Sequence, residues 1–455
     1  MSEQMTALDA TFLELEEVDE TAHMHVGGAM VFDALSNGGP PGLDELRHHL
    51  AGRLDALPRY RQRLSATHTG GLRWPEWVDD LNFDIARHVR RAGLPAPGGR
   101  DELLEYCARF WSHRLDRRRP LWEVVLLEGL ADGRWALVTK THHCMVDGIS
   151  SVDAAHLLLD AEPEPASRPL PPPPQPSKRD SLLNATIRAA LHPRASLHKA
   201  RLMAELLVRD EVLPAPKTAL NVPIGTERRF EATCVPLAEV KAIKRELGGT
   251  VNDVVLAACA GAFRHLMLIR GDDLPEAGLR AMVPVNVRPD SDRGKLGNQV
   301  SSLFVHLPVI EPDPLRRYHL LEAEAADLKS GEQAAGGQAL VGVTALAPPV
   351  IHSYAARSLF ASRLFNTTIT NVPGPQVPLY AFGARMREVY PLVPLAAEHV
   401  VGIAVVSYDG RLFFGLIADR DQLPELPELR IGLEQSLAEL MRLAGIHHHE
   451  EEVIA

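Results

Sequence analysis

Alternating apolar and polar positions predict a β-strand over residues 135–143, and a turn signal follows it at Asp147–Gly148. An apolar run over residues 150–159 then predicts a helix that begins at a serine N-cap. Two adjacent histidines, His142 and His143, therefore stand at the end of a strand, on the loop into a helix. Loops at strand ends commonly present catalytic side chains on a rigid scaffold.

The same patterns predict mixed sheets with helices packed on them, which places the chain in the α/β class as an α+β sandwich. A tight Asp409–Gly410 turn is expected to join the last two strands into a hairpin. Thr250 is expected to cap an apolar helix that ends before Gly271. Other strands are expected near residues 23–32, from 120, and at 279–288, 298–308 and 365–375, and other helices at 43–57 and 101–115.

A Pro-rich stretch divides the chain into two halves. The length of 455 residues favours two domains with a large core. We expect an N-terminal domain over residues 1–162 and a C-terminal domain over residues 220–446. Residues 163–219 form a linker with a basic helix, and residues 447–455 form a tail in which three histidines are not expected to bind metal.

Composition excludes several classes of protein. A net charge of -11 argues against nucleic acid as a partner. The four cysteines show no framework spacing, which fits a reducing cytoplasm. The N-terminus lacks the pattern of a signal peptide, and no run is expected to reach the apolar length of a membrane span. Any membrane association is therefore expected to be peripheral.

The segment over residues 180–209 is the most basic part of this acidic protein, with Arg188, Arg194, Lys199 and Arg201 among its cations. Two interpretations stay open. The segment is either a solvated helix that crosses between the domains, or a surface that meets anionic lipid or the phosphates of CoA.

The two histidines are expected to divide their work. Successive side chains on a strand point to opposite faces, so His142 and His143 cannot both enter one pocket if the strand runs through both of them. One would act as a general base, since a neutral imidazole has an ordinary pKa near ~6.5, and the other would be a buried support. Asp147 could orient the base, bind a metal, or hold the loop against a distant arginine.

Other interpretations of this cluster compete with catalysis. The histidines and Asp147 could form a structural polar cluster. A metal site is disfavoured because the rings diverge and no further ligand set lies nearby in the sequence. Nothing beyond adjacency argues for Cys144 as a nucleophile. Neither a G-x-S-x-G nucleophile elbow nor a Walker-type phosphate loop occurs.

The segment His142-His-Cys-Met-Val-Asp-Gly148 resembles the HHxxxDG signature of the bacterial wax ester synthase/diacylglycerol acyltransferase family. Further stretches resemble motifs of this family: Pro120-Leu-Trp122, Asn252-Asp253 and Asn371-Val-Pro-Gly-Pro375. The resemblance covers nearly the whole chain. It implies two domains that resemble chloramphenicol acetyltransferase, with an active-site channel along their interface.

The resemblance also implies a mechanism and roles for particular residues. His143 is the expected base, which lets an alcohol attack acyl-CoA directly, with His142 in support and no metal or other cofactor. Asp147 and Gly148 are expected to be structural, with Asp147 paired to Arg288. The expected oxyanion or substrate-binding residues are Thr370, Asn371, Asn286 and Ser302; Asn371 could instead only cap the Pro-Gly turn.

The acceptor expected from the resemblance is diacylglycerol or a long-chain alcohol, at the inner membrane face or on lipid bodies. Two alternatives stay open: an idle relative that coats lipid surfaces, and acyl transfer from a carrier protein. One departure is the stretch at residues 398–403, Glu-His-Val-Val-Gly-Ile, where the family usually carries a glycine-rich approach and an asparagine. This difference puts the shape of the acceptor pocket in question.

Overall fold

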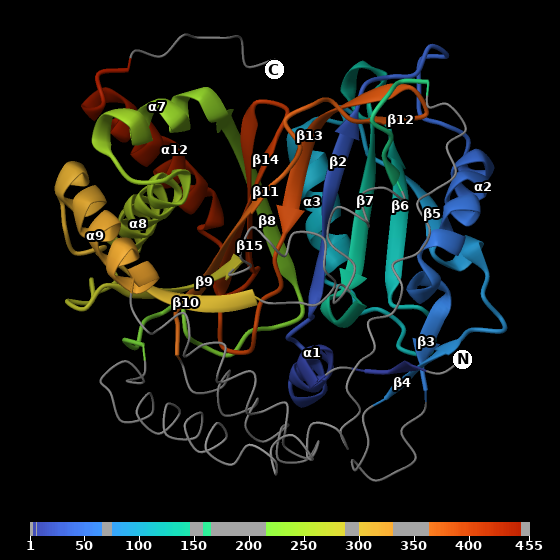
Figure 1. Cartoon of the computed structure of the whole chain (residues 1–455), viewed down its shortest axis with the longest axis horizontal. Helices are drawn as coiled ribbons and strands as arrows, with labels where there is room; N and C mark the ends of the chain where they lie inside the picture. Colours follow the sequence, from blue (N-terminus) through green and yellow to red (C-terminus); the bar gives the residue numbers. More distant parts are fainter. Residues whose placement is uncertain are drawn as a thin grey trace.

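The computed structural model describes residues 3–5, 7–65, 75–145, 158–164, 215–286, 300–330 and 364–446. Two six-stranded mixed sheets lie side by side and form the centre of the molecule (Figure 1). The first sheet has the order β12 (Tyr380–Ala381), β13 (Ala384–Leu392), β2 (His25–Phe32), β7 (Trp135–His142), β6 (Trp122–Glu128) and β5 (Val89–Gly93). The second has the order β10 (Val300–Leu307), β9 (Leu279–Asn286), β11 (Thr367–Pro373), β14 (Val401–Tyr408), β15 (Arg411–Asp419) and β8 (Arg228–Pro236).

The second half of the chain supplies two strands to the first sheet. Strand β13 pairs with β2 in an antiparallel ladder, and β12 continues beyond it to the sheet edge. Gly28 allows this close packing, since a Cβ there would lie 2.5 Å from the Tyr390 carbonyl oxygen, and Gly27 allows the same on the side of β7, at 2.2 Å from the Thr139 oxygen. The same strand approaches the second sheet, because a Cβ on Gly415 of β15 would lie 2.0 Å from the Pro391 oxygen. Strand β13 therefore joins the two sheets.

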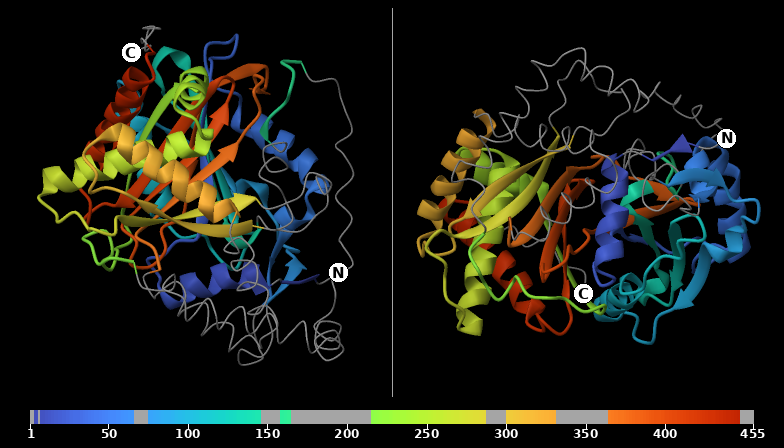
Figure 2. Two further views of the ribbon diagram at one scale, coloured as in Figure 1. Left: turned by 60° about the vertical axis from the view of Figure 1, so that its left-hand side comes forward. Right: turned by 90° about the horizontal axis from the view of Figure 1, so that it is seen from below.

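Helices flank both sheets (Figures 1 and 2). Those beside the first sheet are α2 (Leu43–Arg53) and α3 (Arg100–Trp111), and those beside the second are α7 (Leu237–Leu247), α8 (Val251–Arg270), α9 (Pro314–Ser330) and α12 (Leu426–Leu443). Helix α8 packs closely on α12, since a Cβ on Gly261 would lie 2.2 Å from the Ser436 hydroxyl. At the lower centre of Figure 1, α1 (Ala7–Val18) lies beneath the first sheet. A small third sheet contains β1 (Glu3–Gln4), β4 (Glu76–Asp79) and β3 (Gln62–Leu64). The described 3-10 turns are η1 (Leu54–Ala56), η2 (Pro58–Arg61), η3 (Ile85–Arg87), η4 (Ala131–Gly133) and η5 (His143–Met145).

Helix α8 corrects the expectation that no stretch reaches the length of a membrane span. Among the described residues, Val251–Arg270 passes that test by length and composition alone. However, 72% of its most apolar window is buried inside the fold, as in the core helix of a soluble domain. Most of its apolar residues are therefore accounted for by burial within the fold, whereas Leu268 and Ile269 near its end are exposed.

The two halves contact each other through polar and aromatic side chains. The rings of Trp111 at the end of α3 and Phe230 on β8 meet edge to face, with centroids 4.7 Å apart. The Arg228 backbone N–H donates to the Ser112 hydroxyl at 2.8 Å. These contacts bring the end of α3 and the start of β8 together at the interface between the sheets.

Most predicted elements are confirmed. The expected strand at residues 135–143 is β7, the hairpin is β14–β15, and Asp409 and Gly410 both have the positive φ that its tight turn requires. The Thr250 hydroxyl accepts from the Asp253 N–H, and Gly271 ends α8 in the left-handed region. The Pro-rich linker, the basic segment and the tail lie outside the described residues. Helix α1 was not predicted.

Candidate active site

The histidine pair lies at the point where β7 ends. His142 is the last residue of β7 and stands opposite His25 of β2. His143 begins η5, and its backbone N–H donates to the Met24 carbonyl at 2.8 Å. The Cys144 N–H donates to Nδ1 of His142 at 3.2 Å, so the buried ring also holds the turn that carries His143.

The strand β7 ends at His142 and His143 already belongs to η5, so strand alternation does not apply to the pair, but the two rings still have different surroundings. His142 is completely buried, and its Nε2 lies 3.3 Å from a carboxylate oxygen of Glu16 on α1. Burial lowers the pKa of His142, and the Glu16 carboxylate opposes this effect only in part. His143 is half-buried, and its ring stacks on that of Phe12 with centroids 3.8 Å apart and an interplanar angle of 23°.

Glu16 is the centre of a buried charge cluster. It is 1% exposed, and its Oε2 accepts from Arg117 Nη2 at 2.8 Å and from Nε at 3.2 Å. Arg114 Nε lies 3.5 Å from the other oxygen, and His25 Nε2 lies 3.8 Å from it. Burial alone would raise the pKa of Glu16, but the adjacent His142, His25 and Arg117 side chains lower that pKa well below its ordinary range. Glu16 is therefore an ionised carboxylate inside the protein.

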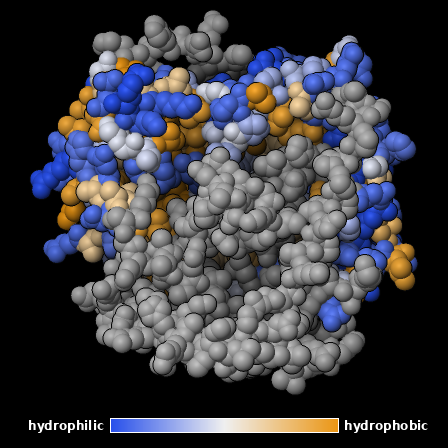
Figure 3. Space-filling view, in the orientation of Figure 1, coloured by the Kyte–Doolittle hydropathy of each residue, from blue (hydrophilic) through white to orange (hydrophobic). Residues whose placement is uncertain are grey.

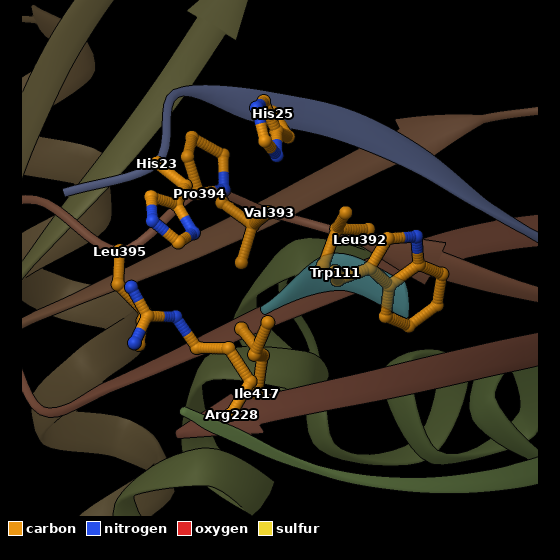
Figure 4. Close-up of a pocket in the computed structure, with 9 residues that line it drawn as sticks. All are labelled: His23, His25, Trp111, Arg228, Leu392, Val393, Pro394, Leu395 and Ile417. Atoms are coloured by element: carbon orange, nitrogen blue, oxygen red, sulfur yellow. The ribbon is translucent and has the colours of Figure 1, made fainter. Parts of the chain in front are cut away.

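A small hollow lies behind this cluster, between the two halves of the chain (Figure 4). His23 and His25 enter it from one side, and Arg228 enters from β8. Its size suits about one water molecule. Burial, followed by the charge of Arg228, lowers the pKa of His23 to about 4, so the imidazole is neutral at pH 7. The hollow is much too small for a substrate.

The motif residues of the second half lie on β11 and α8. Thr370 and Asn371 are half-buried near the end of β11, and the Asn371 amide donates to Oδ1 of Asn252 at 3.4 Å. The ladder between β11 and β9 ends at Thr368, whereas the ladder to β14 continues to Pro373. Thr370 and Asn371 therefore follow the point where β11 stops pairing with β9.

The unusual stretch at residues 398–403 has a structural role at the other end of β11. The His399 ring is 2% exposed, stacks on Phe365 at 4.0 Å and places Nε2 3.0 Å from the Phe365 carbonyl oxygen. Asn221 donates to the same carbonyl oxygen at 3.2 Å and to the Glu398 oxygen at 3.3 Å. These contacts hold the residues that lead into β11, so His399 is a buried support for that strand.

Some predicted site residues lie outside the described parts of the chain: Asp147, Gly148 and Arg288. Asn286 and Ser302 lie on the neighbouring strands β9 and β10, of which the backbone alone is described at these positions. Burial raises the pKa of the Cys144 thiol well above its ordinary value, which disfavours it as a nucleophile. Within the described residues, no cluster of three His, Cys, Asp or Glu side chains could hold a metal ion.

Phe12 and Glu16 were missed by the sequence interpretation. Both lie on α1, one helical turn apart, and their spacing places them on one helix face with Asp9 and Leu13. An acidic residue on the apolar face of a short helix is a detectable signal, because a buried charge requires a partner. The partners, however, come from the segment after α3, from β2 and β7, and from η5, which the sequence does not connect.

Comparisons with known proteins show the family to which this chain belongs. A family model described as the wax ester synthase/diacylglycerol acyltransferase catalytic domain matches residues 5–255, and one described as the WS/DGAT C-terminal domain matches residues 296–441. Two Mycobacterium tuberculosis proteins named as probable diacylglycerol O-acyltransferases, tgs1 and tgs2, are 35% and 37% identical to this chain. The alignments cover 97% and 96% of this chain, and 96% and 98% of the two relatives.

Solved structures confirm the predicted fold class. The wax ester synthase/diacylglycerol acyltransferase from Marinobacter aquaeolei VT8 is 30% identical, with a TM-score of 0.72 over 97% of this chain and 100% of that one. The starter condensation domain of rhizomide synthetase is 16% identical, with a TM-score of 0.60 over 98% of this chain and 94% of that one. The second similarity is one of fold alone.

Proposed function

Because the chain belongs to the wax ester synthase/diacylglycerol acyltransferase family and is an acyltransferase, we propose that it esterifies diacylglycerol or a long-chain alcohol with the acyl group of acyl-CoA. The observation that carries this proposal is the match of both family domains to a chain whose His142–His143 pair ends a strand beside the interface of its two halves. Acyl-CoA is a co-substrate here, and no metal or other cofactor takes part.

His143 is the general base of the proposed reaction. It removes the proton from the acceptor hydroxyl as the oxygen attacks the thioester carbon. The new C–O bond forms, the C–S bond of the tetrahedral intermediate breaks, and the imidazolium returns its proton to the CoA thiolate. Its half-buried ring supports this role, because a base that meets substrate needs access, which the completely buried His142 lacks. A positioned base contributes roughly 10²–10⁴-fold in rate.

Donors from the second half would stabilise the oxyanion of the intermediate. Thr370 and Asn371 are the candidates, since they lie where β11 stops pairing with β9, and the Asn371 amide is oriented by Asn252. One such donor is worth about 3–4 kcal/mol of transition-state stabilisation. Asn286 and Ser302, on β9 and β10, would contact the substrate at the same sheet.

Asp147 and Gly148 would shape the loop after the histidines, with Asp147 paired to Arg288. We also propose the domain division at residues 1–162, 163–219 and 220–446, with a tail at 447–455. The two separate sheets support it, although β12 and β13 cross from the second domain to complete the first sheet.

The enzyme would act in the cytoplasm, at the inner membrane face or on lipid bodies, since its proposed acceptors are lipids. Exposed large apolar side chains, among them Leu268, Ile269 and Leu320 of α8 and α9, support contact with such a surface. In Figure 3, apolar residues lie among charged ones over these helices.

An acceptor panel tests the proposal. The purified protein would be mixed with labelled palmitoyl-CoA and, in turn, diacylglycerol, hexadecanol and a short alcohol. We expect triacylglycerol or wax ester, with CoA released in equal amount. If the thioester stays intact with every acceptor, the result would support an idle lipid-binding relative. Turnover only with an acyl carrier protein would support the carrier-dependent reaction.

A further inference from the structure

We propose that Phe12 and Glu16 of α1 are positioning residues for the catalytic histidine, an inference that rests on His143 as the base of the proposed function. The helix would present one face to the histidine pair and hold both rings from the same side. Neither residue belongs to the HHxxxDG segment, and 126 positions separate Glu16 from His142 in the sequence (142 minus 16).

The first part of the argument is the geometry of α1. Residues four apart on a helix share a face, so Phe12 and Glu16 point in the same direction. Phe12 stacks on the ring of His143, with centroids 3.8 Å apart, and Glu16 lies 3.3 Å from the ring of His142. Stacking limits the rotation of the His143 imidazole, which reduces the freedom lost when the reactive geometry forms.

The second part is a chain of contacts from Glu16 to the turn that carries His143. Nδ1 of His142 accepts the Cys144 N–H, so its proton resides on Nε2, which faces the Glu16 carboxylate. The carboxylate thus favours one tautomer and one orientation of His142. In that orientation His142 holds the backbone of Cys144, the residue after His143.

The third part is the anchoring of α1 itself. Arg117 donates to the Leu13 carbonyl at 3.0 Å as well as to the Glu16 carboxylate, and Arg114 donates to the Glu16 carbonyl at 3.3 Å. Cations that bond the last carbonyls of a helix stabilise its C-terminal end. The helix is therefore fixed to the segment after α3 as well as to the histidines.

A charge-removing substitution tests Glu16, with a neighbour as the matched control. We expect Glu16→Gln to lower kcat by about tenfold, the lower end of the range found for groups that orient a histidine in metal sites, with KM for palmitoyl-CoA within about twofold. Glu17 also bonds Arg117, at 2.9 Å, but its side chain is 62% exposed and touches neither histidine. Glu17→Gln should keep kcat within about twofold. Equal losses in both variants would overturn the proposal.

A double-mutant cycle tests whether Glu16 acts through His142. If it does, Glu16→Gln combined with His142→Ala should lose little more activity than the worse single variant. Multiplied losses in the double variant would show that Glu16 acts elsewhere. If circular dichroism shows that Glu16→Gln does not fold, Glu16→Asp takes its place. A folded Glu16→Asp variant that keeps the parental kcat and changes only KM would contradict the assignment of Glu16 as a positioning residue.

Phe12 offers an independent test because its side chain is not charged. Phe12→Tyr keeps the flat ring and should retain kcat, whereas Phe12→Leu keeps an apolar side chain without a ring and should lower kcat with little change in KM. Equal kcat in the two folded variants would overturn the role of stacking. His143→Ala in the same assay distinguishes the proposed base from the proposed positioning residues. Full activity of this variant would contradict His143 as the base. An inactive His143→Ala beside fully active Phe12 and Glu16 variants would contradict only the positioning role of α1.

Discussion

His25 and His142 occupy directly opposed positions on β2 and β7, and their rings meet edge to face with centroids 6.3 Å apart. Burial lowers the pKa of both imidazoles, so neither carries a charge at pH 7. Glu16 lies close to both rings, and Arg117 supplies the positive charge that balances it. The interior beside the candidate base therefore holds one buried carboxylate, compensated by Arg117 and the nearby Arg114, among neutral rings.

The histidine pair allows a comparison of two adjacent side chains. We expect His143→Ala to lose most activity, at least about 10²-fold, because it removes the proposed base. His142→Ala, if folded, should keep appreciable activity, with a loss closer to about tenfold, because its ring only orients the turn. Steady-state release of CoA would measure both. Comparable losses in the two folded variants would contradict this division of roles.

The proposed pair of Asp147 with Arg288 gives a second prediction, although both residues lie outside the described parts of the chain. Removing one partner of a buried ion pair typically costs about 3–5 kcal/mol, because the other charge is stranded. Asp147→Asn and Arg288→Met should each lower the free energy of unfolding. The double variant should lose less than the sum of the two, as measured by urea unfolding. Additive losses of unfolding free energy would show that Asp147 and Arg288 do not form a pair.

The basic segment at residues 180–209 is the basis of a third prediction. Each cation near an anionic membrane surface adds about 1 kcal/mol of binding free energy, and salt screens this attraction. Neutralising Arg188, Arg194, Lys199 and Arg201 together should reduce sedimentation with anionic vesicles while sparing turnover of a soluble acceptor. Unchanged vesicle binding would identify the segment as a connector between domains.

The hollow between the two halves predicts a dependence of stability on pH. His23 takes up a proton near pH 6.5 when unfolded but only at about 4 when folded, because it is buried beside Arg228. Its contribution is therefore complete above pH 6.5 and is lost as the pH falls from 6.5 to 4, by at most about 3 kcal/mol. His25 and His142, whose pKa values are also lowered, add to the loss below pH 6.5. The lowered pKa of Glu16 matters only below its ordinary pKa of 4.5.

Urea unfolding at pH 7 and pH 5 would measure this dependence. His23→Gln removes one titrating group and should reduce the loss of stability between the two pH values by up to about 1.4 kcal/mol per pH unit. His48→Asn replaces an exposed histidine and serves as the control. Equal losses in the parent and in the His23 variant would show that this imidazole does not govern the acid response.

The sequence by itself determined the local elements of this protein and its family. The strand that ends at His142, the Thr250 cap and the Asp409–Gly410 hairpin are all confirmed, because each depends on residues within a few positions of one another. Side-chain alternation and turn chemistry act over that range. The family motifs identified the fold class, whereas the different surroundings of His142 and His143 depend on contacts with α1.

The tertiary structure alone decided which distant groups meet. Periodicity assigns a residue to a face of its helix or strand, but it does not say which element packs on that face. The sequence therefore identifies Glu16 as an acidic residue on a helix face, but its contacts with Arg117 and His142 can be identified only from the fold. The pairing of β13 with the first sheet could not be predicted from the sequence either. The pairing of distant strands depends on chain topology and on the burial of whole faces rather than on local preference.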